Sequence, residues 1–267
     1  VVVAFSRTPY CKARKGSFAQ LHPVEYGAQT LLGVLARVPQ LRPEDIGDVI
    51  MGCAMPFGVQ GGNMARLIVQ RAGLPDCVTA QTVNRYCSSG LQTIATAANA
   101  IRCGEEDVVI AGGVESMSLV PMLVGAEDAD PWLAEHRPEV YTTMGITAEN
   151  VARQWGISRA DMDAMAVESH RRAAQAQAGG CFDGQIIPIT VPGPDGGEVV
   201  VCRDEGIRPG TTAETLAGLK PCFLENGSVT AATSSQMTDG AGFVVLMSEE
   251  KAAELGVKPL ARFVSFA

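Results

Sequence analysis

Cys87 stands between a strand-like and a helix-like segment, where its thiol could act as a nucleophile. The residues around it read Val83-Asn84-Arg85-Tyr86-Cys87-Ser88-Ser89-Gly90. The first turn of a helix has backbone N–H groups without partners and the positive end of the helix dipole, and both favour a thiolate over a thiol. The same N–H groups can hold a developing oxyanion. This pattern predicts acyl transfer through a thioester, although a packed core cysteine fits the local sequence as well.

The other thiols and imidazoles show no reactive pattern of their own. The remaining cysteines are Cys11, Cys53, Cys77, Cys103, Cys181, Cys202 and Cys222, and the histidines are His22, His136 and His170. None of them forms a C-x-x-C pair or a local Cys/His cluster, so no metal site is predicted. Eight thiols in 267 residues do not make a disulfide scaffold. They indicate a reducing, cytoplasmic compartment in which most of these thiols are small buried hydrophobes.

Composition excludes several classes of protein. Hydrophobic residues make up 46% of the chain and charged residues 19%, which is typical of a folded α/β protein with a sizeable core. The net charge of −8 lacks the basic surface of a general nucleic-acid binder. No apolar run is long enough to span a bilayer, so no integral membrane protein is predicted.

The first part of the chain alternates strand-like and helix-like segments. Strands are predicted at residues 1–5, 48–54, 78–84 and 107–111, and helices at 24–38, 63–72 and 88–103. Short connections between alternating elements favour a mixed, mostly parallel sheet covered by helices. The predicted buried stripe of the helix after Cys87 consists of Leu91, Ile94, Ala95, Ala98 and Ile101. Gly112-Gly113 is expected to end the strand at 107–111.

The middle of the chain leaves this pattern and the end returns to it. Residues 115–141 contain three prolines and no clear period. Helices are predicted at 147–155 and 158–178, the second beginning with a capping box from Ser158 to Asp161. Strands are predicted at 185–191, 198–202, 240–247 and 260–267. The chain therefore reads as a core, an inserted subdomain and a return to the core.

Four segments together resemble the thiolase family. Asn84-Arg85-Tyr86-Cys87-Ser88-Ser89-Gly90 resembles its nucleophile motif, and Ala111-Gly112-Gly113-Val114-Glu115-Ser116-Met117-Ser118 resembles its AGG-x-E-x-M segment. Met144-Gly145-Ile146-Thr147-Ala148-Glu149-Asn150 resembles the MG-x-TAEN stretch. Gly227-Ser228-Val229-Thr230-Ala231, with Ser234-Ser235 and Asp239-Gly240-Ala241, resembles the G-x-VTA…S…DGA run. The matches are in order and span almost the whole chain.

The resemblance implies a layered thiolase-type α/β fold, of which this chain is the N-terminal half. Residues 1–117 would form the core, 118–234 an inserted α+β loop subdomain that binds coenzyme A, and 235–267 the return to the core. Cys87 would be the acyl-carrying nucleophile. The C-terminal half is expected to be absent from this chain.

The resemblance also implies contacts to coenzyme A. Arg208 matches an arginine near the adenine and phosphate end, Thr215 stands where some relatives have Ser, and Ser235 matches a serine near the pantetheine. Met144 would line the acyl pocket and Phe223 would lie near the adenine or pantetheine. Alternatively, Arg208 is a solvated loop residue, Met144 fills the core and Ser235 caps the backbone. Thr143 stands at a position where short-chain biosynthetic relatives commonly have a histidine.

Three groups that the family mechanism uses are not found in this sequence. It has no Gly-His-Pro histidine, no Asn-Glu-Ala-Phe asparagine and no convincing C-x-G cysteine. Either the chain is the N-terminal part of a longer enzyme or a partner chain supplies the rest. We favour the first, because residues 260–267 are expected to end in mid-strand.

The resemblance implies a thiolase that cleaves 3-ketoacyl-CoA with coenzyme A to acyl-CoA and acetyl-CoA. Coenzyme A and acyl-CoA are substrates, no prosthetic group is expected, and the family forms dimers or tetramers. The alternatives are an acetyltransferase that forms acetoacetyl-CoA and a non-catalytic half-fold that binds acyl-CoA. A decarboxylating ketoacyl synthase also has a cysteine at a helix start, but the segments 144–150 and 227–241 disfavour it.

Overall fold

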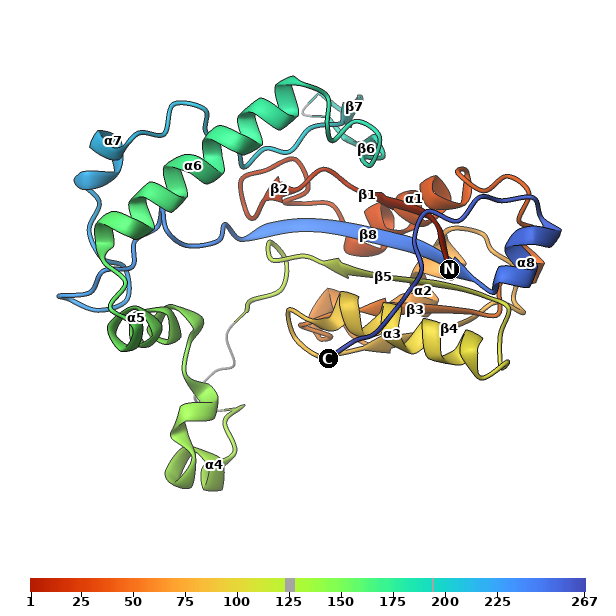
Figure 1. The fold of residues 1–267 in the computed structure, drawn as a ribbon, viewed down its shortest axis with the longest axis horizontal. Coiled ribbons are helices and arrows are strands. Elements are labelled where there is room, and N and C mark those ends of the chain that lie inside the picture. Colours follow the sequence, from red (N-terminus) through yellow and green to blue (C-terminus); the bar gives the residue numbers. More distant parts are fainter. Residues whose placement is uncertain (123–127, 194) are drawn as a thin grey trace. The chain divides into compact units, whose positions relative to one another are not determined.

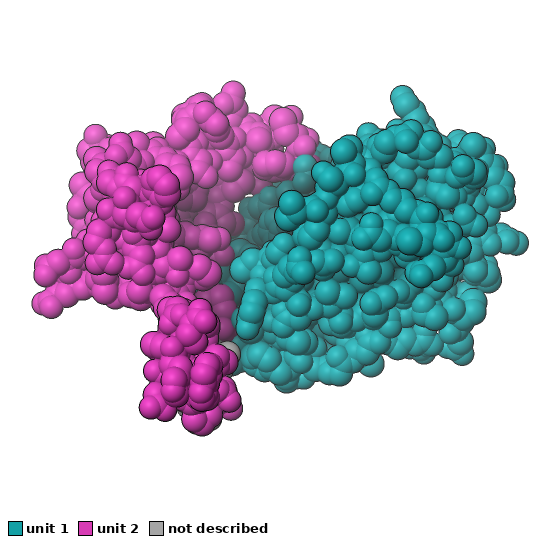
Figure 2. Space-filling model, turned by 60° about the horizontal axis from the view of Figure 1, so that its bottom comes forward, with its two compact units in different colours: residues 1–121, 183–205, 237–267 teal, residues 122–182, 206–236 magenta. Residues whose placement is uncertain are grey.

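The computed structural model describes residues 1–122, 128–193 and 195–267. By their internal contacts these residues form two compact units, shown in separate colours in Figure 2. Unit 1 comprises residues 1–121, 183–205 and 237–267, and unit 2 comprises residues 122–182 and 206–236. The stretch 183–205, which lies inside the predicted insertion at 118–234, packs in unit 1.

Unit 1 is built on a six-stranded sheet in which a single strand runs against the others. The path across the sheet is β1 (Val2–Arg7), β8 (Thr238–Met247), β5 (Val108–Glu115), β3 (Asp48–Gly52) and β4 (Thr79–Val83), with the short β2 (Cys11–Lys12) also on β8. β3 pairs in parallel with β4 and β5, whereas β8 is antiparallel to β1, β2 and β5. The predicted mixed, mostly parallel sheet is therefore confirmed.

Helices cover both faces of this sheet (Figure 1). α1 (Pro23–Leu35) and α2 (Met64–Arg71) pack on one face, and α3 (Ser89–Arg102) packs on the other. Alternate strand residues serve the two faces: Val49 and Met51 of β3 join the core under α1 and α2, whereas Ile50 joins the core under α3. The strands are buried on both sides, which explains their nearly continuous apolar sequences. Unit 1 also contains three short helical elements, η1 (Pro43–Asp45), η2 (Gly58–Gln60) and α8 (Glu249–Glu254).

The predicted apolar stripe of α3 is only partly correct. Ala95, Ala97 and Ala98 are buried against the sheet, but Leu91 is 61% exposed. Small residues bring the helix close to the strands: a Cβ added at Gly52 of β3 would lie 2.7 Å from the Cβ of Ser89. Because alanine, not leucine, fills this narrow gap, the largest apolar side chain of the first turn points elsewhere.

Two other predicted strands differ from those observed. Gly112 and Gly113 continue β5 and pair with Phe243 and Gly242 of β8, because a strand packed this closely has no room for side chains there. The segment 260–267 is not a strand. It makes one isolated bridge, Ala261 to Val2, and then follows the surface, where the Arg102 guanidinium donates to the carbonyl of Phe263 (2.9 Å).

A two-stranded sheet of β6 (Ile189–Pro192) and β7 (Glu198–Val201) belongs to unit 1. Gln29 of α1 holds it by donating to the carbonyl of Thr190 (3.1 Å) and accepting its N–H (3.0 Å). Arg7 of β1 forms a bidentate ion pair with Asp204 (2.7 and 2.9 Å). These contacts explain why the stretch 183–205 packs with the sheet.

Unit 2 is mainly helical. Its described elements are α4 (Pro131–His136), η4 (Pro138–Tyr141), α5 (Met144–Trp155), α6 (Arg159–Ala178) and α7 (Ala213–Ala217). The predicted capping box of α6 is confirmed, because Ser158 and Asp161 each accept the other's backbone N–H. Within the described ranges, no helix is both long and apolar enough to cross a membrane.

Replacing Ile110→Ala in β5 should lower the free energy of unfolding by about 2–5 kcal/mol, because the side chain is fully buried and its loss leaves a cavity. Chemical denaturation followed by circular dichroism measures this change. Leu67→Ala on the exposed side of α2 is the matched control, with an expected effect of about 0.5 kcal/mol or less. Equal losses in the two variants would contradict the proposed core.

Candidate functional site

Cys87 lies in the turn between β4 and α3, with its residue exposed. The turn is compact: the Ser88 N–H donates to the carbonyl of Arg85 (3.1 Å), and the Ser89 N–H donates to the carbonyl of Tyr86 (3.0 Å). Gln92 then makes a full helical bond to the carbonyl of Ser88 (2.9 Å). The thiol is thus presented at the start of the helix, as the sequence predicts.

The first turn of α3 has spare hydrogen-bond donors. The amides of Gly90 and Leu91 make no hydrogen bond within the part of the chain that the structure describes. Gly90 also faces open space, since a Cβ built there would meet no atom within 4 Å. A carbonyl oxygen can therefore approach these donors without steric hindrance from the helix.

A pocket of about 400 Å³ adjoins Cys87 in unit 1. Its walls come from α3 and from three strands of the sheet, and they include Leu91, Ile94, Gly112, Phe243 and Val244. The side chains are mostly apolar, and glycine backbone forms part of the floor. A reactive thiol therefore lies beside apolar surface.

The other cysteines separate into two groups. Cys11 and Cys53 are buried, whereas the other five are exposed like Cys87, so the expectation that most thiols are buried is wrong. The exposed thiols lie in loops and at helix ends, such as Cys103 at the C-terminal end of α3. Burial, together with the nearby Glu115 carboxylate, raises the pKa of Cys53 to about 12. Burial likewise raises the pKa of Cys11, with a contribution from Glu205.

Each of the three histidines has a local structural partner. His22 caps α1, its Nδ1 accepting the N–H of Val24 (3.3 Å). His136 stacks on Trp132 with ring centroids 4.6 Å apart. His170 of α6 accepts the N–H of Arg208 at Nδ1 (3.3 Å). None of these contacts prepares an imidazole to activate Cys87.

Two of the expected coenzyme A contacts, Met144 and Phe223, lie on adjacent segments of unit 2. Both side chains are exposed, and the Phe223 ring lies directly over Gly145, next to Met144 at the start of α5. A side chain at position 145 would collide with this ring. Met144 is therefore not core filler in this unit, and both residues remain open to a ligand.

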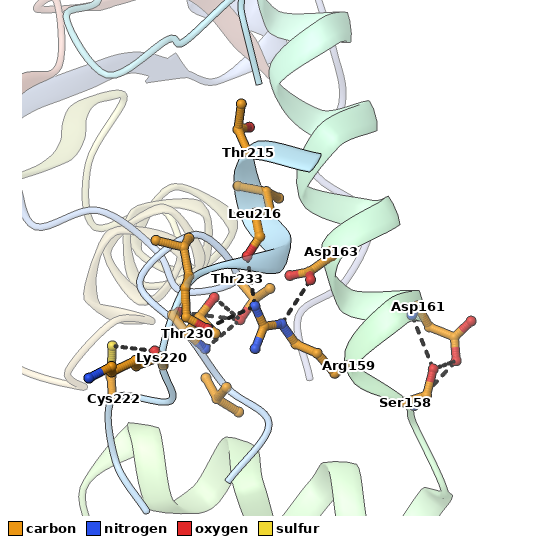
Figure 3. Close-up of polar contacts among 12 residues, drawn as sticks. Ser158, Arg159, Asp161, Asp163, Thr215, Leu216, Lys220, Cys222, Thr230 and Thr233 are labelled. Atoms are coloured by element: carbon orange, nitrogen blue, oxygen red, sulfur yellow. Dashed lines mark hydrogen bonds and ion pairs between the residues drawn. The ribbon is translucent and has the colours of Figure 1, made fainter. Parts of the chain in front are cut away.

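Thr215 lies in α7 (Figure 3), where it has a structural role. Its hydroxyl donates to the carbonyl of Thr212 (2.8 Å) and accepts the Thr212 N–H (3.0 Å), which completes a capping box. The far end of α7 is held by Arg159, whose guanidinium donates to the carbonyl of Leu216 (2.8 Å) and to Asp163 (2.8 Å). The helix thus holds Thr215 in a fixed position, but its hydroxyl is already engaged.

Arg208 and Ser235 come from neighbouring segments of unit 2, and both are exposed. The Gln236 side chain donates to the carbonyl of Gly206 (2.6 Å), which ties the two segments together. The Arg208 carbonyl accepts the Thr211 hydroxyl (2.9 Å), and its N–H is held by His170, so the backbone is ordered while the guanidinium remains exposed. The structure therefore places an available cation beside the segment that carries Ser235.

Glu149 connects two of the segments that carry the family resemblance. Its buried carboxylate accepts the N–H groups of Ser228 (2.9 Å) and Val229 (2.8 Å) and the Ser228 hydroxyl (3.0 Å). Burial alone would raise the pKa of Glu149, but these hydrogen bonds hold its pKa below the usual value. The carboxylate therefore fixes the 227–229 segment against α5.

Glu115 and Asp239 have the same role in unit 1, and sequence reasoning missed it. Glu115 accepts the N–H groups of Ala54 (2.7 Å) and Met55 (3.3 Å) and so holds the loop after β3. Asp239, fully buried at the start of β8, accepts the N–H (2.9 Å) and the hydroxyl of Ser118. The signal was an acidic residue inside an otherwise apolar or small-residue segment, where burial requires a hydrogen-bonded partner.

Comparison with known proteins agrees with these motifs. The family model described as the thiolase N-terminal domain matches residues 1–250. The chain is 50% identical to a 3-ketoacyl-CoA thiolase of Bacillus subtilis and 42% identical to an acetyl-CoA acetyltransferase of Cupriavidus necator, covering 100% of this chain and 70% of each relative. The crystal structure of the Bacillus anthracis acetyl-CoA acetyltransferase superposes with a TM-score of 0.87 at 39% identity, over 97% of this chain and 68% of that chain.

Glu149→Gln should destabilise the attachment of the 227–229 segment to α5 by about 1–3 kcal/mol, because an amide cannot accept hydrogen bonds from all of these donors. Faster hydrogen exchange of the Ser228 and Val229 amides would report this loss. A lowered carboxyl pKa stabilises the fold above the ordinary Glu value, and that stability disappears as pH falls through the folded-state pKa. After correction for the intrinsic slowing of amide exchange at low pH, the protection factors of these two amides in wild-type protein should therefore fall as the pH drops through the folded-state pKa. Glu225→Gln, at an exposed position, is the control.

The thiols should also differ in reactivity towards iodoacetamide. At pH 8 Cys87 should be alkylated and Cys53 should not, because Cys53 is buried and its pKa is raised to about 12. Peptide mapping by mass spectrometry measures both sites in one sample. Alkylation of Cys53 at the same rate as Cys87 in folded protein would contradict the described burial.

Proposed function

The chain belongs to the thiolase family, and from that premise we propose that Cys87 is the acyl-carrying nucleophile of a thiolase acyltransferase. The observation that carries this proposal is the exposed thiol at the start of α3, next to the unpaired amides of Gly90 and Leu91. A helix N-terminus stabilises the thiolate, and free amides can stabilise a thioester oxyanion. No other described cysteine lies at the start of a helix.

The proposed reaction is 3-ketoacyl-CoA plus CoA giving acyl-CoA plus acetyl-CoA. The Cys87 thiolate attacks the C3 carbonyl carbon, and the bond between C2 and C3 breaks. The acyl group remains on sulfur as a thioester, while C2 takes the electron pair and a proton and leaves as acetyl-CoA. A second CoA thiolate then attacks the acyl thioester and releases Cys87. Substrates alternate with products, as in ping-pong kinetics.

The groups that the resemblance implies for proton transfer are not found among these 267 residues. The sequence has no Gly-His-Pro histidine and no convincing C-x-G cysteine, and the histidines it does have are engaged elsewhere. The curated relatives named above are longer, since the chain covers 70% of each. Completing the reaction therefore requires a base and an acid from a C-terminal thiolase half, on the same polypeptide or a partner chain.

For coenzyme A we propose contacts from Arg208, Thr215, Phe223, Ser235 and Met144, within the subdomain at 118–234 and at its boundary. Arg208 has an exposed guanidinium, which suits a phosphate group. Phe223 and Met144 offer adjacent exposed apolar surface for the pantetheine or acyl part. Thr215 is the weakest of these, because its hydroxyl already caps α7.

The preferred substrate is a 3-ketoacyl-CoA in degradation of fatty acids by β-oxidation. Thr143, in place of the histidine common in short-chain biosynthetic relatives, supports this choice. The close alternative is acetoacetyl-CoA formation, and relatives of both names match the chain. We further propose a cytoplasmic homodimer or homotetramer, in keeping with eight free thiols and the family resemblance.

Incubation of the chain with acetyl-CoA should add one acetyl group to the peptide that contains Cys87, as read by mass spectrometry. Cys87→Ser should abolish the adduct, because the nucleophile is gone. Cys103→Ser, which removes the exposed thiol at the other end of α3, is the matched control and should leave it intact.

A different outcome would support the non-catalytic alternative. If coenzyme A binds but Cys87 remains unmodified, even when a C-terminal thiolase half is supplied, the chain is an acyl-CoA-binding half-fold and the acyltransferase proposal fails.

A further inference from the structure

A buried hydroxyl holds the two sides of the turn that carries Cys87. Ser89 is 4% exposed, and its Oγ accepts the N–H of Arg85 (2.9 Å) while donating to the carbonyl of Tyr86 (2.5 Å). Both partners precede Cys87 in the chain, whereas Ser89 follows it. The hydroxyl therefore closes a loop around the cysteine, from the end of β4 to the first residue of α3.

The loop that Ser89 closes contains a strained residue. Tyr86 has a φ of +46°, in the left-handed region that a bulky residue disfavours. Its side chain is 64% exposed and does not anchor it in the core. The backbone is held instead at both ends: the Tyr86 N–H donates to Asn84 Oδ1 (2.8 Å), and its carbonyl accepts from Ser89. Hydrogen bonds, not packing, maintain the bend before Cys87.

Ser89 itself rests on the sheet. A Cβ at Gly52 of β3 would lie 2.7 Å from the Ser89 Cβ and 2.8 Å from the Gly90 nitrogen, so the strand backbone lies directly beneath the first turn. One turn later, the Thr93 hydroxyl donates to the carbonyl of Gly112 in β5 (3.0 Å). The hydroxyl that closes the loop is thus attached to a part of α3 that cannot shift relative to the sheet.

We propose that Ser89 is a positioning residue, which fixes the direction of the Cys87 side chain relative to the amides of the first turn of α3. The proposal rests on the nucleophilic role proposed for Cys87. Without the Ser89 hydroxyl, the N–H of Arg85 loses its partner and the carbonyl of Tyr86 keeps only the Ser89 N–H (3.0 Å), so the left-handed bend is held less firmly. Cys87 then samples orientations away from the helix amides, and its thiolate is less well stabilised.

The test compares cysteines within the same molecule. In Ser89→Ala, iodoacetamide should alkylate Cys87 about fivefold or more slowly at pH 7, because a buried hydrogen-bonded pair has been lost. Cys103, at the opposite end of α3, should react at its wild-type rate. Thr96→Val removes a hydroxyl that donates to the Gln92 carbonyl in the same helix and should leave Cys87 unaffected. An unchanged Cys87 rate in Ser89→Ala would overturn the proposal.

A second variant distinguishes positioning from general loss of structure. Asparagine tolerates the left-handed region, so Tyr86→Asn combined with Ser89→Ala should recover at least half of the lost Cys87 rate. The buried thiol of Cys53 reports whether the fold has opened. If Ser89→Ala exposes Cys53, the double variant must restore both its protection and the Cys87 rate, and failure to do so overturns the proposal.

The acetyl-CoA experiment separates this inference from the proposed function. If wild-type protein forms no acetyl-Cys87 even when a C-terminal thiolase half is supplied, the nucleophilic role fails, while the alkylation rates still decide whether Ser89 orients the thiol. If acetyl-Cys87 forms at the same rate in wild-type and Ser89→Ala, the nucleophile stands and the positioning role is wrong.

Discussion

The close seating of α3 on the sheet is the constraint on which the Cys87 turn depends. Gly52 of β3 leaves no space for a side chain beneath Ser89, and buried alanines continue the contact along the helix. Because the helix axis is fixed by this contact, the direction of its first-turn amides is fixed as well. The short connection from β4 must then bend sharply to meet the helix, which explains the left-handed conformation of Tyr86.

Buried carboxylates provide the second level of organisation, and each connects segments far apart in sequence. Glu115 holds the loop after β3, Asp239 holds the chain after β5, and Glu149 holds the 227–229 segment against α5. In each case the carboxylate accepts at least one backbone N–H and so specifies a loop path, and the hydroxyls of Ser118 and Ser228 add side-chain donors. The segments that resemble the thiolase family therefore contain residues that organise the fold along with Cys87.

The sequence was sufficient to predict most strands and helices of unit 1, because buried strands and the helices between them have distinct periods. It also placed Cys87 correctly at the start of α3. It could not predict that Leu91 is exposed or that Gly112-Gly113 continues β5, because both depend on how closely α3 and β8 approach the other strands. The roles of Glu149 and Asp239 could not be predicted either, because their hydrogen-bond partners lie about 80 and 120 residues away in the sequence. The expected coenzyme A contacts rest on the family resemblance. The local geometry argues only against a contact from Thr215, whose hydroxyl already caps α7.

The position of β8 affects the order in which this protein can fold during synthesis. β1 joins the sheet only through β8, which pairs Val2 with Leu246 and Val108 with Met247. During synthesis β1 therefore waits for a partner more than 230 residues later, while β3, β4 and β5 can already pair in parallel. Such distant closure raises the contact order and slows folding. During that interval the apolar β1 and the edge of β5 are open to chaperones or to misassembly with another nascent chain.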